Sequence, residues 1–551
     1  MTPTVTKTGW INNAMTGLHV LGARLTDLIT LLAVATFLTT CSADRGLVKH
    51  TGFNAGAAQD VLAAAFAGVI KYHVDPHTPR TLALSALDGL QTLDDAVRVA
   101  DEGKNLWLTR GDHPGVTVPL PRRGDSDDWA DVVVAAVEQL RPLSPVLAEK
   151  STDDFLNALL PRSLSQLDQY SRYADPEIAR DRRAARHGFT GIGVTITRDD
   201  GRVKINQVYD RSPAAKAGLM AGDIIVAVDG VAIEDGNLRA VARRVRGVSG
   251  TLVRLTLRRR DETLDIAIRR APVVPQTIAL RRAGGFSIIK ISGFNEHTSR
   301  DLVRALDRDA DAGEPAGVIL DLRQNRGGLL NEAVEVADLF IPGGTLLATH
   351  GRHPRADQYF KAEARDRLVD VPMVALVDRG SASAAEIVAG ALQDSGRALV
   401  VGTRTFGKGS VQTVLNLPNG GEITVTWARM FAPSGYSLAR FGVYPSVCVG
   451  DIVGGNKAID SRAIAALDTH HLSLRRRITD MSAGEQDALL ARCAARPATK
   501  ETGAARDHDL QVAQTLLRDR ALYAKMRRKT AIAIAGGSPE PPATSLGSAT
   551  R

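Results

Sequence analysis

The chain contains 551 residues, more than one hydrophobic core normally supports, so its length predicts three or four domains. Hydrophobic residues make up 44% of the chain and charged residues 24%, which is typical of a folded globular protein. The net charge of +8 is spread over the sequence, and aromatic residues amount to only 4%. This composition argues against nucleic-acid binding, because it provides neither a concentrated basic patch nor side chains on which bases could stack.

Patterns typical of metal-binding proteins are absent from the sequence: it has no HExxH, no CxxC, and no histidines and carboxylates at ligand spacing. We therefore expect no metal and no other cofactor. The neighbouring His470 and His471 are expected to lie at the surface. The three cysteines, Cys41, Cys448 and Cys493, are too few for a disulfide framework.

Residues 1–43 have the composition of an export signal. The run LITLLAVATFLTT at residues 28–40 has about the length of the hydrophobic region of a signal peptide and is short for a membrane span. Lys7 and Arg24 precede this run, and Cys41 follows it directly. We expect a signal peptide or a membrane anchor here, with Cys41 as the candidate residue for lipidation. An amphipathic N-terminal helix buried in the fold is the alternative.

The next two regions differ in their hydrophobic patterns. Residues 44–187 are predicted to be helical, because runs such as DVLAAAFAGVIKY and DWADVVVAAVEQL carry apolar residues at helical spacing. The stretch GDHPGVTVPLPRRGDSDD is rich in Pro and Gly and predicts a loop within this region. Short alternating runs over residues 188–272 predict a small β-barrel-like domain with two short helices. The first helix, SPAAKAGL, has Ser212 at its N-cap and Pro213 at its first position.

Strands and helices alternate over residues 273–455. The continuous apolar strands FSIIKIS, AGVILDLR and PMVALVDR are each followed by an amphipathic helix. This order predicts a mixed, mostly parallel sheet that is covered on both faces. The sequence TSRD at Thr298–Asp301 predicts a capping box at the start of one helix. Residues 456–535 are predicted to be helical, and residues 536–551 to form a disordered tail.

The stretch GTRTFGKGS at residues 402–410 is similar to a phosphate-binding loop but lacks two of its requirements. Such a loop carries Ser or Thr directly after its lysine and continues into a helix. Here Gly409 follows Lys408, and the next residues, SVQTVLNLPNG, alternate like a strand that ends in an Asn-Gly turn. A magnesium-dependent nucleotide site is therefore the weakest of our hypotheses, and Lys408 requires another explanation.

Three loops at the ends of predicted strands carry the parts of a serine hydrolase that uses no histidine. Ser383 stands just before a helix, and Gly327 and Gly328 leave backbone N–H groups open to an oxyanion. Lys408 can act as the base for a serine if burial away from water and carboxylates lowers its pKa. Gln412 can orient such an amine without adding charge.

Each of these residues also has a simpler explanation. Ser381 and Ser383 can cap a helix, Lys408 can be a solvated turn residue, and the two neighbouring glycines can form a plain turn. Composition alone does not exclude these alternatives.

Five stretches follow one another in a specific order between residues 188 and 447: GFTGIGVTI, DRSPAAKAGLMAGDIIVAVDG, GVILDLRQNRGGLLNEAVEVADLFI, GSASAAEIVAGALQDSGRALVVGTRTFGKGSVQ and ARMFAPSGYSLARFGVYPSV. Together they resemble the carboxyl-terminal processing proteases, the PDZ-containing Ser-Lys serine proteases of peptidase family S41. The resemblance implies a protease core of the ClpP/crotonase-like type over residues 273–455, with a PDZ domain inserted at residues 188–272. Upstream, YHVDP and LDQYSRYADPE are similar to the N-terminal helical segment of this family, separated by an insertion around residues 95–150.

The resemblance also assigns roles to catalytic residues. It implies that Ser383 is the nucleophile and that Lys408 is its base, with Gln412 as the polar partner of the lysine. The oxyanion would be bound by the backbone amides of Gly328 and Ala384.

A peptide-binding groove is implied in the PDZ domain. The terminal carboxylate of a substrate would meet a glycine-containing loop, and its last residues would add as a strand against a helix. The residues expected to form this groove are Gly191, Ile192, Gly193, Val194, Val241 and Val245.

Together, these features predict an exported serine endopeptidase, located in the bacterial periplasm or at a membrane facing it. It would capture protein substrates by apolar C-terminal tails, and the PDZ domain would gate its active site. The expected partners are such substrates, an adaptor or activator protein, and further copies of the chain. The alternative is a peptide-binding adaptor with an inert protease core.

Overall fold

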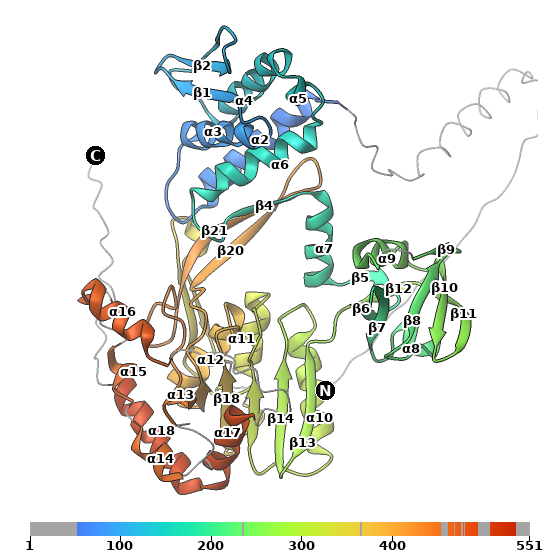
Figure 1. The fold of residues 1–551 in the computed structure, drawn as a ribbon. Coiled ribbons are helices and arrows are strands. Elements are labelled where there is room, and N and C mark those ends of the chain that lie inside the picture. Colours follow the sequence, from blue (N-terminus) through green and yellow to red (C-terminus); the bar gives the residue numbers. More distant parts are fainter. Residues whose placement is uncertain are drawn as a thin grey trace, which may run out of the picture. The chain divides into compact units, whose positions relative to one another are not determined.

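A computed structural model of the chain describes residues 52–233, 236–363, 366–452, 461–467, 469–474, 478, 480–493 and 507–535 (Figure 1). The predicted export signal with Cys41 and the predicted tail at residues 536–551 lie outside these residues. Among the helices that are described, none is both long and apolar enough to cross a bilayer.

The N-terminal part of the described chain consists of helices packed around their own hydrophobic core. The helices in this core are α2 (Ala55–Tyr72), α3 (Pro79–Leu87), α4 (Ser126–Leu140), α5 (Pro145–Ala148) and α6 (Thr152–Ser165). Between α3 and α4 lies an antiparallel sheet of β1 (Val97–Asp101), β2 (Asn105–Arg110) and β3 (Val116–Pro119). The helix α7 (Pro176–His187) follows and leads towards the next unit.

The loop predicted for GDHPGVTVPLPRRGDSDD is wrong in part, because Val116–Pro119 forms β3 and pairs with β2. The sheet order makes β3 an edge strand. An edge tolerates proline, because one side of its backbone needs no hydrogen-bond partner. The high Pro and Gly content of the stretch hid the short alternation VTV.

A small β-rich unit follows, in which five strands run in the order β11-β10-β8-β7-β6 around a separate hydrophobic core. The strands are β6 (Val194–Asp199), β7 (Arg202–Val208), β8 (Ile224–Val228), β10 (Leu252–Arg259) and β11 (Glu262–Arg269), with β9 (Val231–Ala232) beside β8. Its helices are α8 (Pro213–Lys216) and α9 (Leu238–Val245), and the short strands β5 (Phe189–Gly191) and β12 (Ala271–Val273) pair with each other. The predicted cap of α8 is confirmed, because Ser212 Oγ accepts a hydrogen bond from the Ala215 amide at 3.1 Å.

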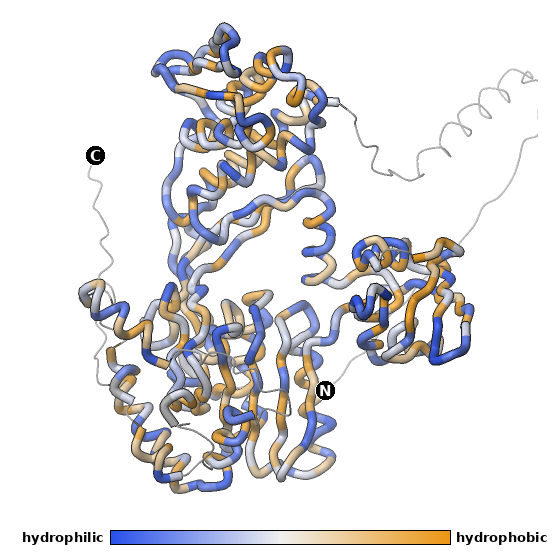
Figure 2. The backbone as a smooth tube through the Cα atoms, viewed as in Figure 1, coloured by the Kyte–Doolittle hydropathy of each residue, from blue (hydrophilic) through white to orange (hydrophobic). Residues whose placement is uncertain are grey.

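The core sheet has the order β13-β14-β15-β18-β19-β22, with β13 antiparallel and the other neighbours parallel. Its strands are β13 (Ile278–Ala283), β14 (Phe286–Ile291), β15 (Val318–Asp321), β18 (Met373–Val377), β19 (Ala398–Gly402) and β22 (Val447–Cys448). The inner strands β15, β18 and β19 are almost wholly apolar, whereas the edge strand β13 carries two arginines (Figure 2).

Alternate residues of the buried strands point to opposite faces of this sheet. Helices cover both faces and bury these side chains. Leu320 and Ala375 pack in one core, whereas Ile319 and Val374 pack in another. The first core includes residues of α10 (Thr298–Ala310), α11 (Leu330–Asp338) and α12 (Ala384–Asp394). The second includes residues of α14 (Ser461–Ala466), α17 (His508–Arg518) and α18 (Arg520–Ala535).

The capping box predicted at Thr298–Asp301 is wrong. Thr298 is the first residue of α10 and is fully buried, with His297 at the N-cap position. Its hydroxyl accepts a hydrogen bond from the Asn295 amide at 3.0 Å and shares another with Thr277 Oγ1 at 2.8 Å. Because the hydroxyl forms hydrogen bonds with these neighbouring segments, it does not cap the helix.

A second sheet carries the residues around Lys408. Its order is β17-β16-β21-β20, from β16 (Thr345–His350), β17 (Gln358–Lys361), β20 (Ser410–Asn416) and β21 (Glu422–Phe431). The strand β4 (Arg172–Ala174) pairs with β21, and apolar side chains of the β20–β21 hairpin enter the N-terminal core. The hairpin next to Lys408 therefore belongs structurally to both the protease core and the N-terminal helices.

A disulfide links the C-terminal helical region to the core sheet. Cys448 in β22 is bonded to Cys493, 45 residues later, just after α16 (Ala483–Ala491). His471 in α15 (His470–Leu474) is only 4% exposed, and its Nε2 donates a hydrogen bond to the carbonyl oxygen of Pro445 at 3.0 Å. The prediction that His471 lies at the surface is therefore wrong, because the helix turns this residue towards the core.

Candidate active site

Ser383 occupies the junction between β18 and α12, at the carboxyl edge of the parallel sheet. Its backbone has a φ of +56°, a region that non-glycine residues rarely adopt. The Ser383 amide donates a hydrogen bond to Glu386 Oε2 at 2.7 Å, which holds the residue in this conformation. Strained backbone of this kind is frequent at catalytic residues, because the surrounding structure must fix it in place.

The loop that contains Gly327 and Gly328 lies directly against Ser383. A Cβ added to Gly327 would be 2.8 Å from Ser383 Cβ and 3.0 Å from the Ala384 nitrogen, so only glycine fits here. Among the described residues, no group accepts a hydrogen bond from the amides of Gly328 and Ala384. Two backbone N–H groups are therefore available close to the serine, as an oxyanion site requires.

Lys408 lies in the loop between β19 and β20. The residues after it form a strand and not a helix, so the nucleotide-binding alternative lacks the helix on which it depends. Gly409 is required by close packing, because a Cβ at this position would lie 1.9 Å from the Ala439 nitrogen. Gly409 therefore allows the loop that carries Lys408 to pack closely against the backbone of the neighbouring segment.

The environment of Lys408 favours the neutral amine. Burial is the main cause, followed by the nearby Arg172, and together they lower the pKa of Lys408 to about 8. Glu386 and Asp168 oppose this shift. The Nζ atom lies 5.3 Å from the centre of the Tyr170 ring, which packs beside it.

The expectation that Lys408 is remote from carboxylates is wrong. Glu386 is fully buried, and its Oε2 accepts a hydrogen bond from the Lys408 amide at 2.9 Å in addition to the bond from Ser383. Its Oε1 accepts hydrogen bonds from the Gly407 amide at 2.8 Å and from the Thr405 hydroxyl. One side chain thus connects the backbones of the serine and lysine loops.

Burial raises the pKa of Glu386, and the hydrogen bonds to it act in the opposite direction. Each oxygen accepts two hydrogen bonds, which fix the position of the side chain between the two loops. Glu386 was not among the site residues predicted from the sequence. Its place three positions after Ser383, where a capping-box glutamate stands, was the available signal.

Among the described residues, no hydrogen bond joins Gln412 to Lys408. Its Nε2 donates hydrogen bonds to Ser410 Oγ at 2.8 Å and to the Ser410 carbonyl at 3.2 Å. Ser410 lies on the same strand, β20, and the Gln412 amide also donates a longer hydrogen bond of 3.4 Å to Thr426 Oγ1 on β21.

Residues from the N-terminal helical part support the lysine pocket, and our sequence analysis assigned them no role in it. Burial would raise the pKa of Asp168, but hydrogen bonds from His73, Ser171 and the Tyr170 amide hold it well below its usual range. Asp168 also accepts a hydrogen bond from Thr426 on β21 at 3.1 Å. The available signal was the pair of motifs YHVDP and LDQYSRYADPE, which contain His73 and Asp168.

The predicted PDZ groove contains a small cavity of ≈ 60 Å³ between β6 and α9. Of the predicted residues, Ile192, Gly193, Val194 and Val245 line it. Val241 lies on α9 but is buried in the core of this unit, and Gly191 pairs with Ala271 between β5 and β12. Ile196, at the end of the stretch at residues 194–196 beside which the tail is expected to add, also lines it, and the lining residues without a sequence prediction are Phe189, Ala242 and Arg246.

One cluster of residues has the composition of a metal site. Cys448, His471 and Cys493 are buried, and their ligand atoms lie within 4.8 Å of one another. The two sulfur atoms are bonded to each other, and a metal requires free thiolates. In this disulfide form the cluster offers no set of metal ligands.

Comparison with known proteins identifies the family. Residues 285–449 match the family model of peptidase family S41, and residues 204–259 match that of the PDZ domain. The carboxy-terminal-processing protease of Bartonella bacilliformis is 38% identical over 308 residues, which cover 55% of this chain and 70% of the relative. The carboxy-terminal processing protease CtpA of Bacillus subtilis is 32% identical over 325 residues, which cover 58% and 69%.

A solved structure of a photosystem II D1 C-terminal processing protease is 28% identical to the chain. The match covers 66% of this chain and 92% of that protein, with a TM-score of 0.34. This score is too low to support an argument about the arrangement of the whole chain, so the identification depends on the sequence matches. The chain belongs to the carboxyl-terminal processing proteases, the PDZ-containing serine peptidases of family S41.

Proposed function

We propose that the chain cleaves peptide bonds as an endopeptidase with Ser383 as its nucleophile and Lys408 as its general base. The observation that carries this proposal is the lowered pKa of Lys408, about 8, which leaves a substantial fraction of the amine neutral near that pH. The shared hydrogen bonds to Glu386 support it, because they fix the backbones of both residues to one carboxylate.

In the proposed reaction, the neutral Lys408 amine accepts the hydroxyl proton of Ser383 while Oγ bonds to the scissile carbonyl carbon. The carbonyl oxygen becomes negatively charged and accepts hydrogen bonds from the amides of Gly328 and Ala384. The Lys408 ammonium then gives its proton to the leaving amine as the C–N bond breaks, which leaves an ester on Ser383. A water molecule, deprotonated by the same amine, hydrolyses this ester and restores the serine.

The proposal includes capture of apolar C-terminal tails by the PDZ domain, supported by the cavity beside Gly193 and Val194. It also includes gating, in which Gln412 leaves Ser410 and turns to Lys408 in the active arrangement. We further assign the core sheet to the ClpP/crotonase-like type. The apolar run at residues 28–40 supports export to the bacterial periplasm or to a membrane facing it.

The test is turnover of an unfolded protein such as casein by the wild type and by Ser383→Ala. We expect the variant to lose activity by on the order of 10³-fold or more, because no other group replaces the nucleophile. Ser395→Ala, at the other end of α12, is the matched control and should retain wild-type turnover. Equal turnover by the wild type and Ser383→Ala would contradict the proposal. If the wild type binds tails but does not react at Ser383 with a fluorophosphonate, the chain is the inert adaptor of the alternative.

A further inference from the structure

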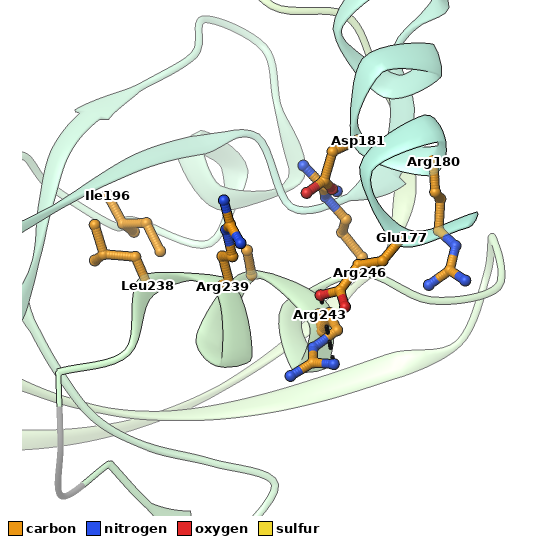
Figure 3. A pocket seen from close by; sticks show the side chains of 9 residues that line it. Glu177, Arg180, Asp181, Ile196, Leu238, Arg239, Arg243 and Arg246 are labelled. Atoms are coloured by element: carbon orange, nitrogen blue, oxygen red, sulfur yellow. Dashed lines mark hydrogen bonds and ion pairs between the residues drawn. The ribbon is translucent and has the colours of Figure 1, made fainter. Parts of the chain in front are cut away.

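A larger cavity of ≈ 360 Å³ adjoins the small PDZ cavity and has a basic lining (Figure 3). The two cavities share Ile196, Ala242 and Arg246, so one follows the other along β6 and α9. The small cavity has the size and apolar lining for a terminal side chain. The larger one is therefore in the position where the residues upstream of that terminus would lie.

Three arginines of α9 and the residue after it line the larger cavity. Arg239, Arg243 and Arg246 are spaced by four and three residues, which places them on the same face of the helix. Ile196, Leu238 and Ala242 supply apolar surface beside them. A ligand that fits this lining is an extended chain with both apolar and negatively charged groups.

Two carboxylates of α7 already bind to these arginines. Glu177 lies 3.6 Å from Arg243, and Asp181 forms an ion pair with Arg246. Both acidic side chains are 50% exposed, and ion pairs at such exposure contribute little to stability. The pairs therefore demonstrate that the arginines accept carboxylates, and they are weak enough to exchange.

The charges that line the larger cavity are unequal. Four arginines, including Arg180 of α7, face only two carboxylates. The guanidinium of Arg246 also lies over the Phe189 ring, at 4.7 Å from its centre, which restricts its movement. The cavity therefore retains positive charge after its internal ion pairs have formed.

We propose that this groove selects C-terminal tails with acidic residues at the second to fourth positions from the end. This inference rests on the proposed capture of tails by the PDZ domain. From Arg239 to Arg246 the chain rises about 10 Å at about 1.5 Å per residue, the length of roughly three residues of an extended strand. A tail that ends beside Gly193 thus brings its upstream side chains to these arginines, where they displace Glu177 and Asp181.

The test measures peptide binding to the full chain carrying Ser383→Ala, which prevents cleavage. Three fluorescein-labelled peptides end in the same valine and differ only at the second to fourth positions, which are aspartates, asparagines or lysines. We expect the aspartate peptide to bind about tenfold more tightly than the lysine peptide, with the asparagine peptide between them. The difference should shrink in about 1 M salt, which screens exposed charges.

Further substitutions locate the effect. Arg239→Ala combined with Arg243→Ala should remove the preference for aspartate over asparagine while the asparagine peptide still binds. Arg254→Ala, exposed on β10 outside the cavity, is the matched control and should keep the preference. Glu177→Gln with Asp181→Asn should tighten binding of the aspartate peptide by about twofold to fivefold, because the competing carboxylates are gone.

Equal affinity for all three peptides would overturn the inference and leave the proposed peptidase intact. A preference that survives the double arginine substitution would also overturn it. If no peptide binds, the tail capture on which the inference rests is wrong, and Ser383-dependent turnover decides the peptidase activity separately.

Discussion

Replacing Lys408 with methionine is expected to lower kcat/KM for casein by on the order of 10³-fold or more. Methionine retains much of the apolar stem of lysine but has no amine, so the pocket beside Tyr170 stays filled while the proton acceptor is lost. The loss should approach that of Ser383→Ala, because a base and a nucleophile that act as a unit are not additive.

The matched control for this substitution is Lys361→Met, which removes an exposed lysine of β17. It should leave kcat/KM within about twofold of the wild type, since surface substitutions of this kind have small effects. Wild-type kcat/KM in a folded Lys408→Met protein would contradict the assignment of this residue as the base.

Replacing Glu386 with glutamine is the second change for which we expect a large effect. The new amide group would face backbone N–H donors that now bind a carboxylate oxygen, so the serine and lysine loops would shift. A displacement of about 1 Å in a catalytic group can reduce the rate on the order of 10²-fold, and we expect kcat to fall by that amount.

A readout beyond activity separates this positioning role from general destabilisation. The Glu386 side chain raises the pKa of Lys408, so its replacement should move the apparent pKa of the kcat/KM profile below that of the wild type. Asp309→Asn is the matched control, because Asp309 is a buried carboxylate bonded to Ser287 at the opposite edge of the core sheet. It should alter thermal stability but not the pH profile. An unchanged profile in Glu386→Gln would contradict the positioning role.

The strand–helix alternation of the protease core was predictable from the sequence, because its buried strands are continuous apolar runs and its helices are amphipathic. The strand β3 and the buried Thr298 were not, since each is defined by the segment it contacts and not by its own residue types. β3 forms because it pairs with β2, and the Thr298 hydroxyl shares a hydrogen bond with the hydroxyl of Thr277, 21 residues away. Local propensity contains no information about such partners.

The candidate site likewise contains residues that could be predicted from the sequence and residues whose role only the folded structure reveals. Ser383, Lys408 and the glycine loop could be named because their residue types are specific to the chemistry and their order matches a family. Glu386 acts through hydrogen bonds to Gly407 and Lys408, which only the folded loop brings to it. Two of the groove arginines, Arg243 and Arg246, were visible in the run RRVRG, but no pattern in the sequence indicated that α7 lies against α9.

In the proposed reaction, Lys408 must be neutral when it accepts the proton of Ser383. The most direct measurement is the rate constant for labelling of Ser383 by a fluorophosphonate from about pH 6 to about pH 10, which requires no knowledge of the substrate. We predict that the rate rises with pH and levels off above an apparent pKa of about 8, as the amine loses its proton. In Lys408→Met this rise should be absent. A rate that does not depend on pH in the wild type, or the same rise in Lys408→Met, would contradict the account.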